Sequence, residues 1–318
     1  MKPLVIYHDN CADGFGAAFA AWTVLGGEAE YVAAQYGKPL VLQDEFLVGI
    51  DVYILDFSFQ REVMDVLFRI AKRVIWLDHH KTAFEMWCGG IPESGIYWSN
   101  TYDNAKIPAN AYIMLDNNKS GAMLAWEYFH HNTEVPMLIK HIDDYDRWKF
   151  KLEGTKEFNK ALWSYAPWSF EQWRDINLCV EENYLAVSES IADKYEYGRM
   201  LIEGAAILRA HAANVQAIVK GAARQCMIST GPLIPHMFDG LAANCPPNLV
   251  SDVGHELATQ SGTFGLLWYI NKDGKCLCSL RSNGDYDVSA IAKSFGGGGH
   301  KNAAGFEVPV ETLLEWIK

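Results

Sequence analysis

The triplet Asp78-His79-His80 follows directly on the apolar run 74–77. Two imidazoles and a carboxylate that leave one buried strand together can be aimed at a single point, which suits a divalent metal ion. Oxygen and imidazole ligands favour Mn²⁺ over the thiolate-loving Zn²⁺. The triplet therefore predicts a metal site at the end of this strand.

Two other segments have the same form. PLVIYHDN ends in His8 and Asp9, and DVYILDFS carries Asp56 at the end of its apolar run. The carboxyl ends of buried parallel strands meet at one edge of a sheet, where function is usually found. We therefore expect the three strand ends to converge on one site.

The segments between these strands predict the fold class. Residues 14–26 are small and apolar with helical spacing, and residues 60–72 are amphipathic. Alternation of strands and helices predicts a mostly parallel sheet with helices on its faces, hence an α/β fold. Further helices are predicted over 119–132, capped by Ser120, and over 181–212.

The last third of the chain predicts a smaller α/β domain. Its predicted elements are strands over 214–221 and 225–230, a helix over 248–259, strands over 263–270 and 276–282 joined by a turn at 271–274, and a helix over 287–295. We therefore expect a first domain over 1–180, a helical linker over 181–213 and a second domain over 214–318.

Four consecutive glycines, Gly296 to Gly299, precede His300 and Lys301. Glycines are entropically costly to order. Their backbone N–H groups, with the imidazole, can bind a phosphate or carboxylate, whereas a bare glycine run can also be a flexible connector. The attached His-Lys-Asn and the following Ala-Ala-Gly favour a binding loop.

Composition narrows the classes of partner. The chain has 318 residues, half of them hydrophobic, a formal net charge of -12, and seven scattered cysteines without a CxxC pair. A broad basic face for long duplex nucleic acid is not expected. No run is long enough to span a membrane, and no leader is evident, so we expect a cytoplasmic protein. Small anionic substrates remain open, because a bound metal supplies local positive charge.

The motifs, taken in order, resemble those of the DHH/DHHA1 phosphoesterase superfamily, in which RecJ-like nucleases and nanoRNase-type oligoribonucleases are found. They are HDNCADGFGAA, Asp56 at a strand end, the DHH triplet, HIDDYDRW, and SLRSNGDYDVSAIAKSFGGGGHKNAAGF. The match covers nearly the whole chain. The resemblance implies a DHH domain joined to a DHHA1-type substrate-binding domain.

The same resemblance implies a manganese-dependent phosphoester hydrolase with two Mn²⁺ ions, Mg²⁺ or Co²⁺ being alternatives. The implied metal ligands are His8, Asp13, Asp56, His79 and Asp144. Of these, Asp56 would bridge the two ions, and Asp143 is the alternative to Asp144. His80 would face the scissile phosphate, and Asp78 would orient its neighbours. The implied substrate-binding residues are Arg281, Gly297, Gly298, His300 and Asn302.

The first motif departs from the HxxxDxD pattern of many members. It is one residue shorter and has Ala12 before its single Asp13. The site of His8 therefore lacks an expected ligand, which Asp9 or Asn10 could replace. Cys11 lies in the same motif, but the sequence assigns it no geometry.

These observations favour hydrolysis of phosphoesters in short nucleotides: oligoribonucleotides, dinucleotides or pAp-like mononucleotides. The alternatives are a single-strand-specific RecJ-like exonuclease and a nucleotide-binding regulator with an incomplete metal centre, which Ala12 suggests. We expect no membrane partner, and the sequence leaves a homodimer open.

Overall fold

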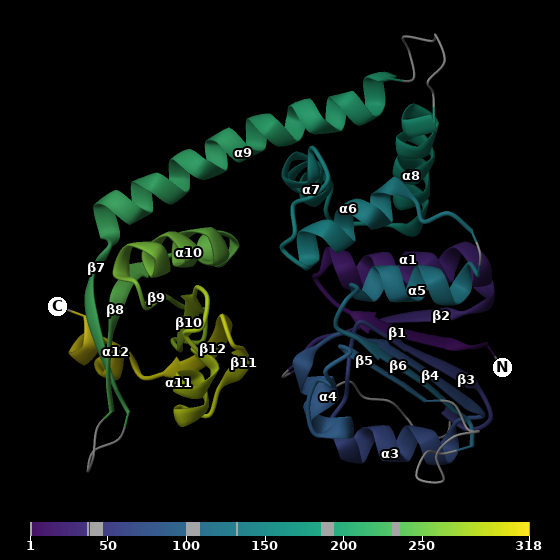
Figure 1. Ribbon diagram of the computed structural model, residues 1–318, viewed down its shortest axis with the longest axis horizontal. Coiled ribbons are helices and arrows are strands. Elements are labelled where there is room, and N and C mark those ends of the chain that lie inside the picture. The colour runs from purple at the N-terminus through teal and green to yellow at the C-terminus, as the bar shows by residue number, and fades with distance from the viewer. Residues whose placement is uncertain are drawn as a thin grey trace. The chain divides into compact units, whose positions relative to one another are not determined.

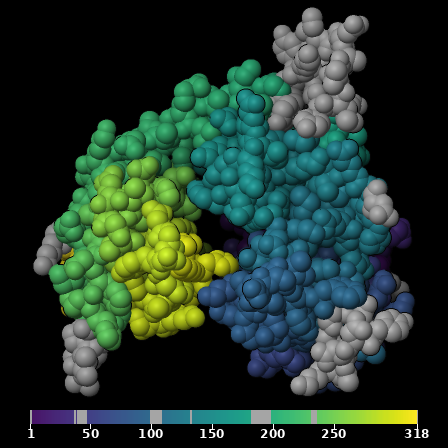
Figure 2. Space-filling model, viewed as in Figure 1, coloured from purple at the N-terminus to yellow at the C-terminus, as the bar shows by residue number. Residues whose placement is uncertain are grey.

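The computed structural model consists of two compact units, Met1–Ile207 and Leu208–Lys318 (Figures 1 and 2). The residues that it describes are 2–36, 38, 47–99, 109–131, 133–185, 194–230 and 236–317. Each unit is a six-stranded sheet with helices against it. The predicted fold class, a mostly parallel α/β unit followed by a smaller α/β unit, is confirmed.

The sheet of the first unit brings three motif strands side by side. Its strands are β1 (Leu4–His8), β2 (Glu30–Ala34), β3 (Asp51–Leu55), β4 (Arg73–Asp78), β5 (Ile96–Ser99) and β6 (Ala111–Asp116). Their order is β2-β1-β3-β4-β6-β5, and only β5 pairs antiparallel. Because β1, β3 and β4 are parallel neighbours, their carboxyl ends lie at one edge of the sheet.

Helices cover both faces of this sheet (Figure 1). They are α1 (Ala12–Leu25), the short η1 (Gly26–Glu28), α3 (Arg61–Ile70), α4 (Lys81–Cys88), α5 (Gly121–Phe129), α6 (Met137–Asp146), α7 (Thr155–Ser164) and α8 (Phe170–Leu185). One apolar core joins the sheet to α1 and α5–α8 around Phe19 and Trp173, and another joins it to α3 and α4 around Met64 and Phe84. As predicted, Ser120 caps α5, its Oγ accepting from the backbone N–H of Met123.

The sheet of the second unit is mostly antiparallel. Its strands are β7 (Arg224–Thr230), β8 (His236–Asn244), β9 (Phe264–Ile270), β10 (Cys276–Ser282), β11 (Gly298–His300) and β12 (Ala303–Val308). Their order is β11-β12-β10-β9-β8-β7, and only β8 and β9 run parallel. The helices of this unit are η2 (Pro247–Leu249), α10 (Val250–Ser261), α11 (Ser289–Ser294) and α12 (Val310–Trp316). The helix α9 (Lys194–Ala222) begins in the first unit and continues into the second from Leu208.

The strand predicted over 214–221 is wrong, because this segment is the end of α9. Its β-branched residues favoured a strand, but Val215 and Val219 are four residues apart and lie on one helical face. Both are buried with α10 in an apolar cluster. The predicted linker, 181–213, falls on the end of α8 and much of α9, apart from 186–193, which lie outside the described residues.

Candidate metal centre

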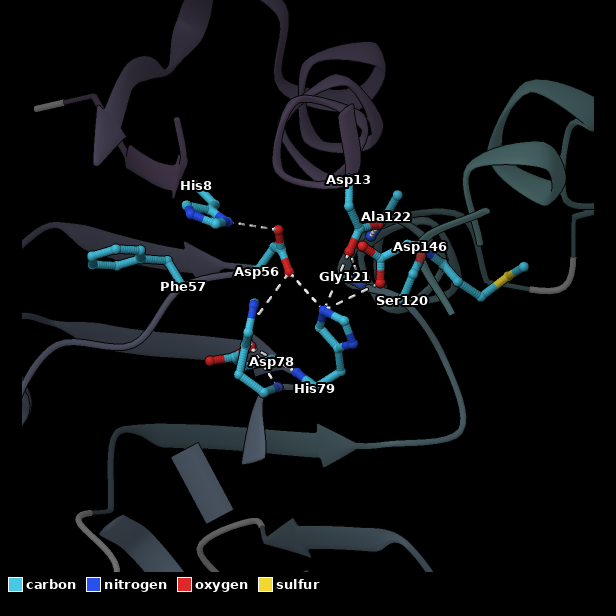
Figure 3. Close-up of polar contacts among 12 residues, drawn as sticks. His8, Asp13, Asp56, Phe57, Asp78, His79, Ser120, Gly121, Ala122 and Asp146 are labelled. Atoms are coloured by element: carbon cyan, nitrogen blue, oxygen red, sulfur yellow. Dashed lines mark hydrogen bonds and ion pairs between the residues drawn. The ribbon is translucent and has the colours of Figure 1, made fainter. Parts of the chain in front are cut away.

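His79, at the carboxyl end of β4, has three carboxylates around its Nε2 atom (Figure 3). The distances are 3.1 Å to Asp56 Oδ1, 3.4 Å to Asp13 Oδ2 and 3.7 Å to Asp146 Oδ2. These aspartates come from the end of β3, the first turn of α1 and the end of α6. Segments far apart in the sequence therefore bring three acids and an imidazole to one point.

The burial and the backbone conformation of Asp56 are energetically unfavourable. Its side chain is 1% exposed, and among the described residues neither carboxylate oxygen has a hydrogen-bond partner. Its backbone φ is 54°, in the left-handed region that non-glycine residues rarely adopt. The Nδ1 atom of His8 lies 3.5 Å from Asp56 Oδ2 and is likewise buried without a hydrogen bond. Buried polar atoms normally find partners, so these atoms fit an additional cationic ligand.

Asp13 is held by the N-terminus of α5. Its Oδ2 accepts from the N–H of Gly121 at 2.7 Å, and its Oδ1 accepts from the N–H of Ala122 at 2.8 Å. The positive end of the helix dipole stabilises the carboxylate there. The approach depends on glycine, since a Cβ at Gly121 would lie 2.4 Å from the Cβ of Asp56.

Asp78 is fully buried and orients the other two residues of the triplet. Its Oδ1 accepts from the backbone N–H of His79 at 2.7 Å and lies 2.7 Å from Nδ1 of His80. Its Oδ2 accepts from the hydroxyl of Ser58. Burial would raise the pKa of Asp78, but the imidazole of His80 lowers it. This carboxylate therefore fixes the direction of both rings.

The three aspartates of α6 do not share one role, and the structure does not support Asp144 as a ligand. The carboxylate of Asp144 accepts from the backbone N–H of Lys151 and Leu152 and from the hydroxyl of Thr155, so it fastens the loop after the helix. Asp146 faces His79 instead.

Asp143, the alternative ligand, accepts the backbone N–H of Ser120 at 2.8 Å and pairs with Arg147. Residues three apart share a helix face, whereas the next residue is turned by about 100°. Helical spacing thus groups Asp143 with Asp146 and turns Asp144 away. This signal was available in the sequence.

The carboxylates that crowd the centre shift the pKa values of its side chains. Burial and the carboxylates of Asp56 and Asp146 raise the pKa of Asp13 well above its ordinary value. Burial opposes the charged form of His79, yet the surrounding carboxylates raise its pKa well above the usual range. Burial would also raise the pKa of Asp56, but the imidazoles of His79 and His8 lower it. A divalent cation bound at this point would balance the charge of these acids.

Ligand atoms gather in three overlapping groups within the described residues. The groups, each with its ligand atoms within 4.8 Å of one another, are Asp56 with Asp78, His79 and His80; His8 with Cys11 and Asp56; and Asp13 with His79 and Asp146. Asp56 and His79 each belong to two of them, and of the two only the carboxylate has two oxygens with which to bridge two ions. Oxygen and nitrogen donors at this spacing fit divalent cations.

Cys11 is the member that sequence reasoning left without a role. Burial and then the carboxylates around it raise the pKa of its thiol well above the usual value. The thiol would therefore bind a cation only by releasing its proton. Asp9, one candidate for the missing ligand, accepts the adjacent N–H of Asn10 with its carboxylate.

In the second unit the glycine run is ordered rather than a loose connector. Gly298–His300 forms β11, which pairs with β12. A Cβ at Gly297 would lie 2.1 Å from the carbonyl oxygen of Gly305, so this close approach requires glycine. His300 and Gly299 are exposed.

The other implied substrate residues also lie in this unit. The side-chain amide of Asn302 donates to Ser282 Oγ and to the carbonyl oxygens of Gly284 and Tyr286, which closes the loop after β10. Arg281, in β10, donates a hydrogen bond from its guanidinium to Ser251 Oγ. Asn302 thus braces the loop that follows Arg281.

The chain matches one domain family and one relative of known sequence. Residues 246–318 match the DHHA1 domain family. Over 322 residues the chain is 32% identical to the uncharacterized protein R106 of Acanthamoeba polyphaga mimivirus, covering 95% of this chain and 66% of that protein. The chain therefore spans about two thirds of the length of this relative.

Two solved structures overlap nearly the whole chain. The pGpG-specific phosphodiesterase PggH of Vibrio cholerae is 12% identical, with 99% of this chain and 96% of that chain covered and a TM-score of 0.46. RecJ of Thermus thermophilus, in complex with Mn²⁺, is 14% identical, with 99% and 50% covered and a TM-score of 0.48. Scores below 0.5 do not by themselves establish a shared fold.

Residues 246–318 therefore form a DHHA1 domain, and a DHH triplet stands at the end of β4 in the first unit. Within the described residues, no helix has the length and apolar character to cross a membrane.

Proposed function

We propose that this protein is a divalent-metal-dependent phosphoesterase acting on short nucleotides: oligoribonucleotides, dinucleotides or pAp-like mononucleotides. The observation that carries the proposal is Asp56, a buried carboxylate with left-handed backbone, whose two oxygens face His8 and His79 and make no hydrogen bond within the described residues. Such an arrangement costs stability, so a functional ligand is its best explanation.

The proposed ligands of one ion are Asp13, Asp56, His79 and Asp146, and those of the other include His8 and Asp56. When bound, two such ions would lower the pKa of a water molecule and neutralise phosphoryl charge. Mn²⁺ suits the oxygen and imidazole donors, and Mg²⁺ or Co²⁺ are alternatives.

The chain's own residues orient the reacting groups. Asp78 holds Nδ1 of His80, so the ring presents its Nε2 side away from that carboxylate. Burial would lower the pKa of His80, but the carboxylate of Asp78 raises it. We propose that Nε2 of His80 donates a hydrogen bond to the scissile phosphate. Arg281 and His300, with the backbone of Gly297 and Gly298, are the residues of the second unit that we propose to bind the substrate.

The net charge of the chain favours short nucleotides over long nucleic acids as substrates. A net charge of -12 opposes a long polyanion, because like charges repel along its whole length, whereas a metal centre can hold one or two phosphates. We also propose a cytoplasmic location, which suits the seven free cysteines, since thiols stay reduced there.

The test is metal-dependent hydrolysis by the purified protein. We expect Mn²⁺ to support turnover of pAp, a linear dinucleotide or short RNA in preference to long single-stranded DNA. Asp56→Asn should reduce kcat/KM by about a thousandfold or more, since a shared ligand serves both ions. Asparagine tolerates positive φ, so the fold should persist. Turnover of long single-stranded DNA above all others would support the RecJ-like alternative, and no turnover with Mn²⁺, Mg²⁺ or Co²⁺ would support a regulator.

A further inference from the structure

We propose that Cys11 is a metal ligand, supplying through its Sγ atom the donor that the shortened first motif lacks at the site of His8 and Asp56. Cys11 stands two residues before Asp13, where the HxxxDxD pattern has its first aspartate. This inference rests on the proposed metal centre and deepens it. It gives one position a mixed nitrogen, oxygen and sulfur donor set, while the position of Asp13 and His79 keeps only oxygen and nitrogen donors.

Geometry carries the assignment. Ligand atoms of His8, Cys11 and Asp56 all lie within 4.8 Å of one another. Two of these residues bring independent signs of a missing ligand, because Nδ1 of His8 and both carboxylate oxygens of Asp56 are buried without hydrogen bonds. Asp56, at 1% exposure, is aimed at the same point from β3. The thiol of Cys11, beside His8 and Asp56, is therefore placed to act as a third donor.

Local structure explains why the cysteine reaches this point. His8 ends β1, and Asn10 turns the chain with a φ of 52°. Cys11 then stands at the N-cap of α1 in extended conformation. A Cβ at Gly14 would lie 2.2 Å from the carbonyl oxygen of His8, so α1 packs tightly against the strand end. The helix N-terminus also favours a negatively charged sulfur.

The inference predicts that the two metal positions prefer different cations. When the sulfur–metal bond forms, the thiol proton passes to solvent. Thiolate ligands favour softer cations such as Co²⁺, Zn²⁺ or Cd²⁺, whereas carboxylate and imidazole accept Mn²⁺ and Mg²⁺. The position of Cys11 should therefore take a softer ion than the position of Asp13.

The experiment is a Co²⁺ titration of the full chain followed by absorption spectroscopy. We expect a thiolate-to-cobalt charge-transfer band in the near ultraviolet, lost in Cys11→Ser and retained in Cys88→Ser, the matched control at an exposed cysteine. Cys11→Ser should still bind one Co²⁺, seen by its visible d–d absorption. Cys11→Asp should weaken Cd²⁺ binding by at least about tenfold.

The outcomes separate this inference from the proposed function. Two bound Co²⁺ ions without the charge-transfer band, or a band that survives in Cys11→Ser, would overturn the role of Cys11 and leave phosphoester hydrolysis standing. If Cys11→Ser does not fold, alkylation of the wild type decides instead. Co²⁺ should protect Cys11 from iodoacetamide while Cys88 reacts as before, and equal labelling of Cys11 with and without metal would refute ligation.

Discussion

Aspartates of α6 that are close in the sequence make different contacts. Asp146 faces the imidazole of His79, whereas Asp144 makes three hydrogen bonds to the loop that follows. Motif order in the sequence pointed to this acidic segment but chose Asp144. Motif order identifies the acidic segment. Which of its aspartates faces His79 depends on the direction in which each side chain leaves the helix.

Paired variants test this separation. Asp146→Ala should weaken Mn²⁺ binding by about 10- to 100-fold with little loss of stability. Asp144→Ala should leave the metal affinity of the folded protein unchanged and lower the free energy of unfolding by about 1–3 kcal/mol, because it orphans buried donors. Calorimetric titration and denaturant unfolding measure the two effects. Weaker metal binding in Asp144→Ala alone would return Asp144 to the ligand set.

His141 offers a test of pH dependence on the same helix. Burial lowers the pKa of His141 to about 4, and its ring stacks on Phe158 with Nδ1 2.9 Å from Thr155 Oγ1. The unfolded chain takes up this proton near pH 6.5 and the folded chain only near pH 4. The contribution of neutral His141 to the free energy of unfolding is therefore fully present above about pH 6.5. It decreases as the pH falls, by about 3 kcal/mol at pH 4.

The variant His141→Gln separates the effect of this residue from that of the other titratable groups. The difference in unfolding free energy between wild type and His141→Gln should shrink by about that amount between pH 7 and pH 4. A difference that stays constant with pH would show that His141 titrates alike in both states.

The elements show what sequence patterns could and could not give. Apolar runs ending in acids or imidazoles gave β1, β3 and β4, and their parallel pairing follows from the helices between them. The N-terminus of α5 was not recognised as part of the site. Its role depends on the tertiary contact between Gly121 and Asp56, which no local pattern contains. The end of α9 was misread because valine and isoleucine suit both strands and buried helix faces.

Gly121→Ala should test how α5 supports the centre. The added methyl group would lie 2.4 Å from Asp56 Cβ and 2.6 Å from its Oδ1, so the carboxylate must move. We expect kcat/KM to fall by about a hundredfold, because small displacements of a reacting group are costly. Gly198→Ala in α9 is the control, since no described atom beyond its own stretch of helix lies within 4 Å of the added Cβ. It should stabilise the helix by about 0.5–1 kcal/mol and preserve activity. Full activity in Gly121→Ala would mean that the centre tolerates the shift.

The division into two units separates metal binding from the residues proposed to hold substrate. All residues of the proposed metal centre lie in Met1–Ile207, and Arg281 and His300 lie in Leu208–Lys318. His300→Ala should therefore raise KM for a short nucleotide about tenfold or more while the Mn²⁺ affinity stays unchanged. Loss of bound Mn²⁺ in this variant would contradict the separation.

Metal removal should affect the two units unequally. A ligand that binds only the folded state stabilises it by RT ln(1 + [L]/Kd), about 2.7 kcal/mol at a hundredfold excess over Kd. Mn²⁺ should therefore slow hydrogen exchange at the carboxyl ends of β1, β3 and β4 and at the start of α5, where the proposed ligands lie. The core strands β9 and β10 of the second unit should exchange at the same rate with Mn²⁺ and with a chelator. Equal protection of both sheets by Mn²⁺ would mean that the cation acts on the second unit as well, and would refute a centre confined to the first.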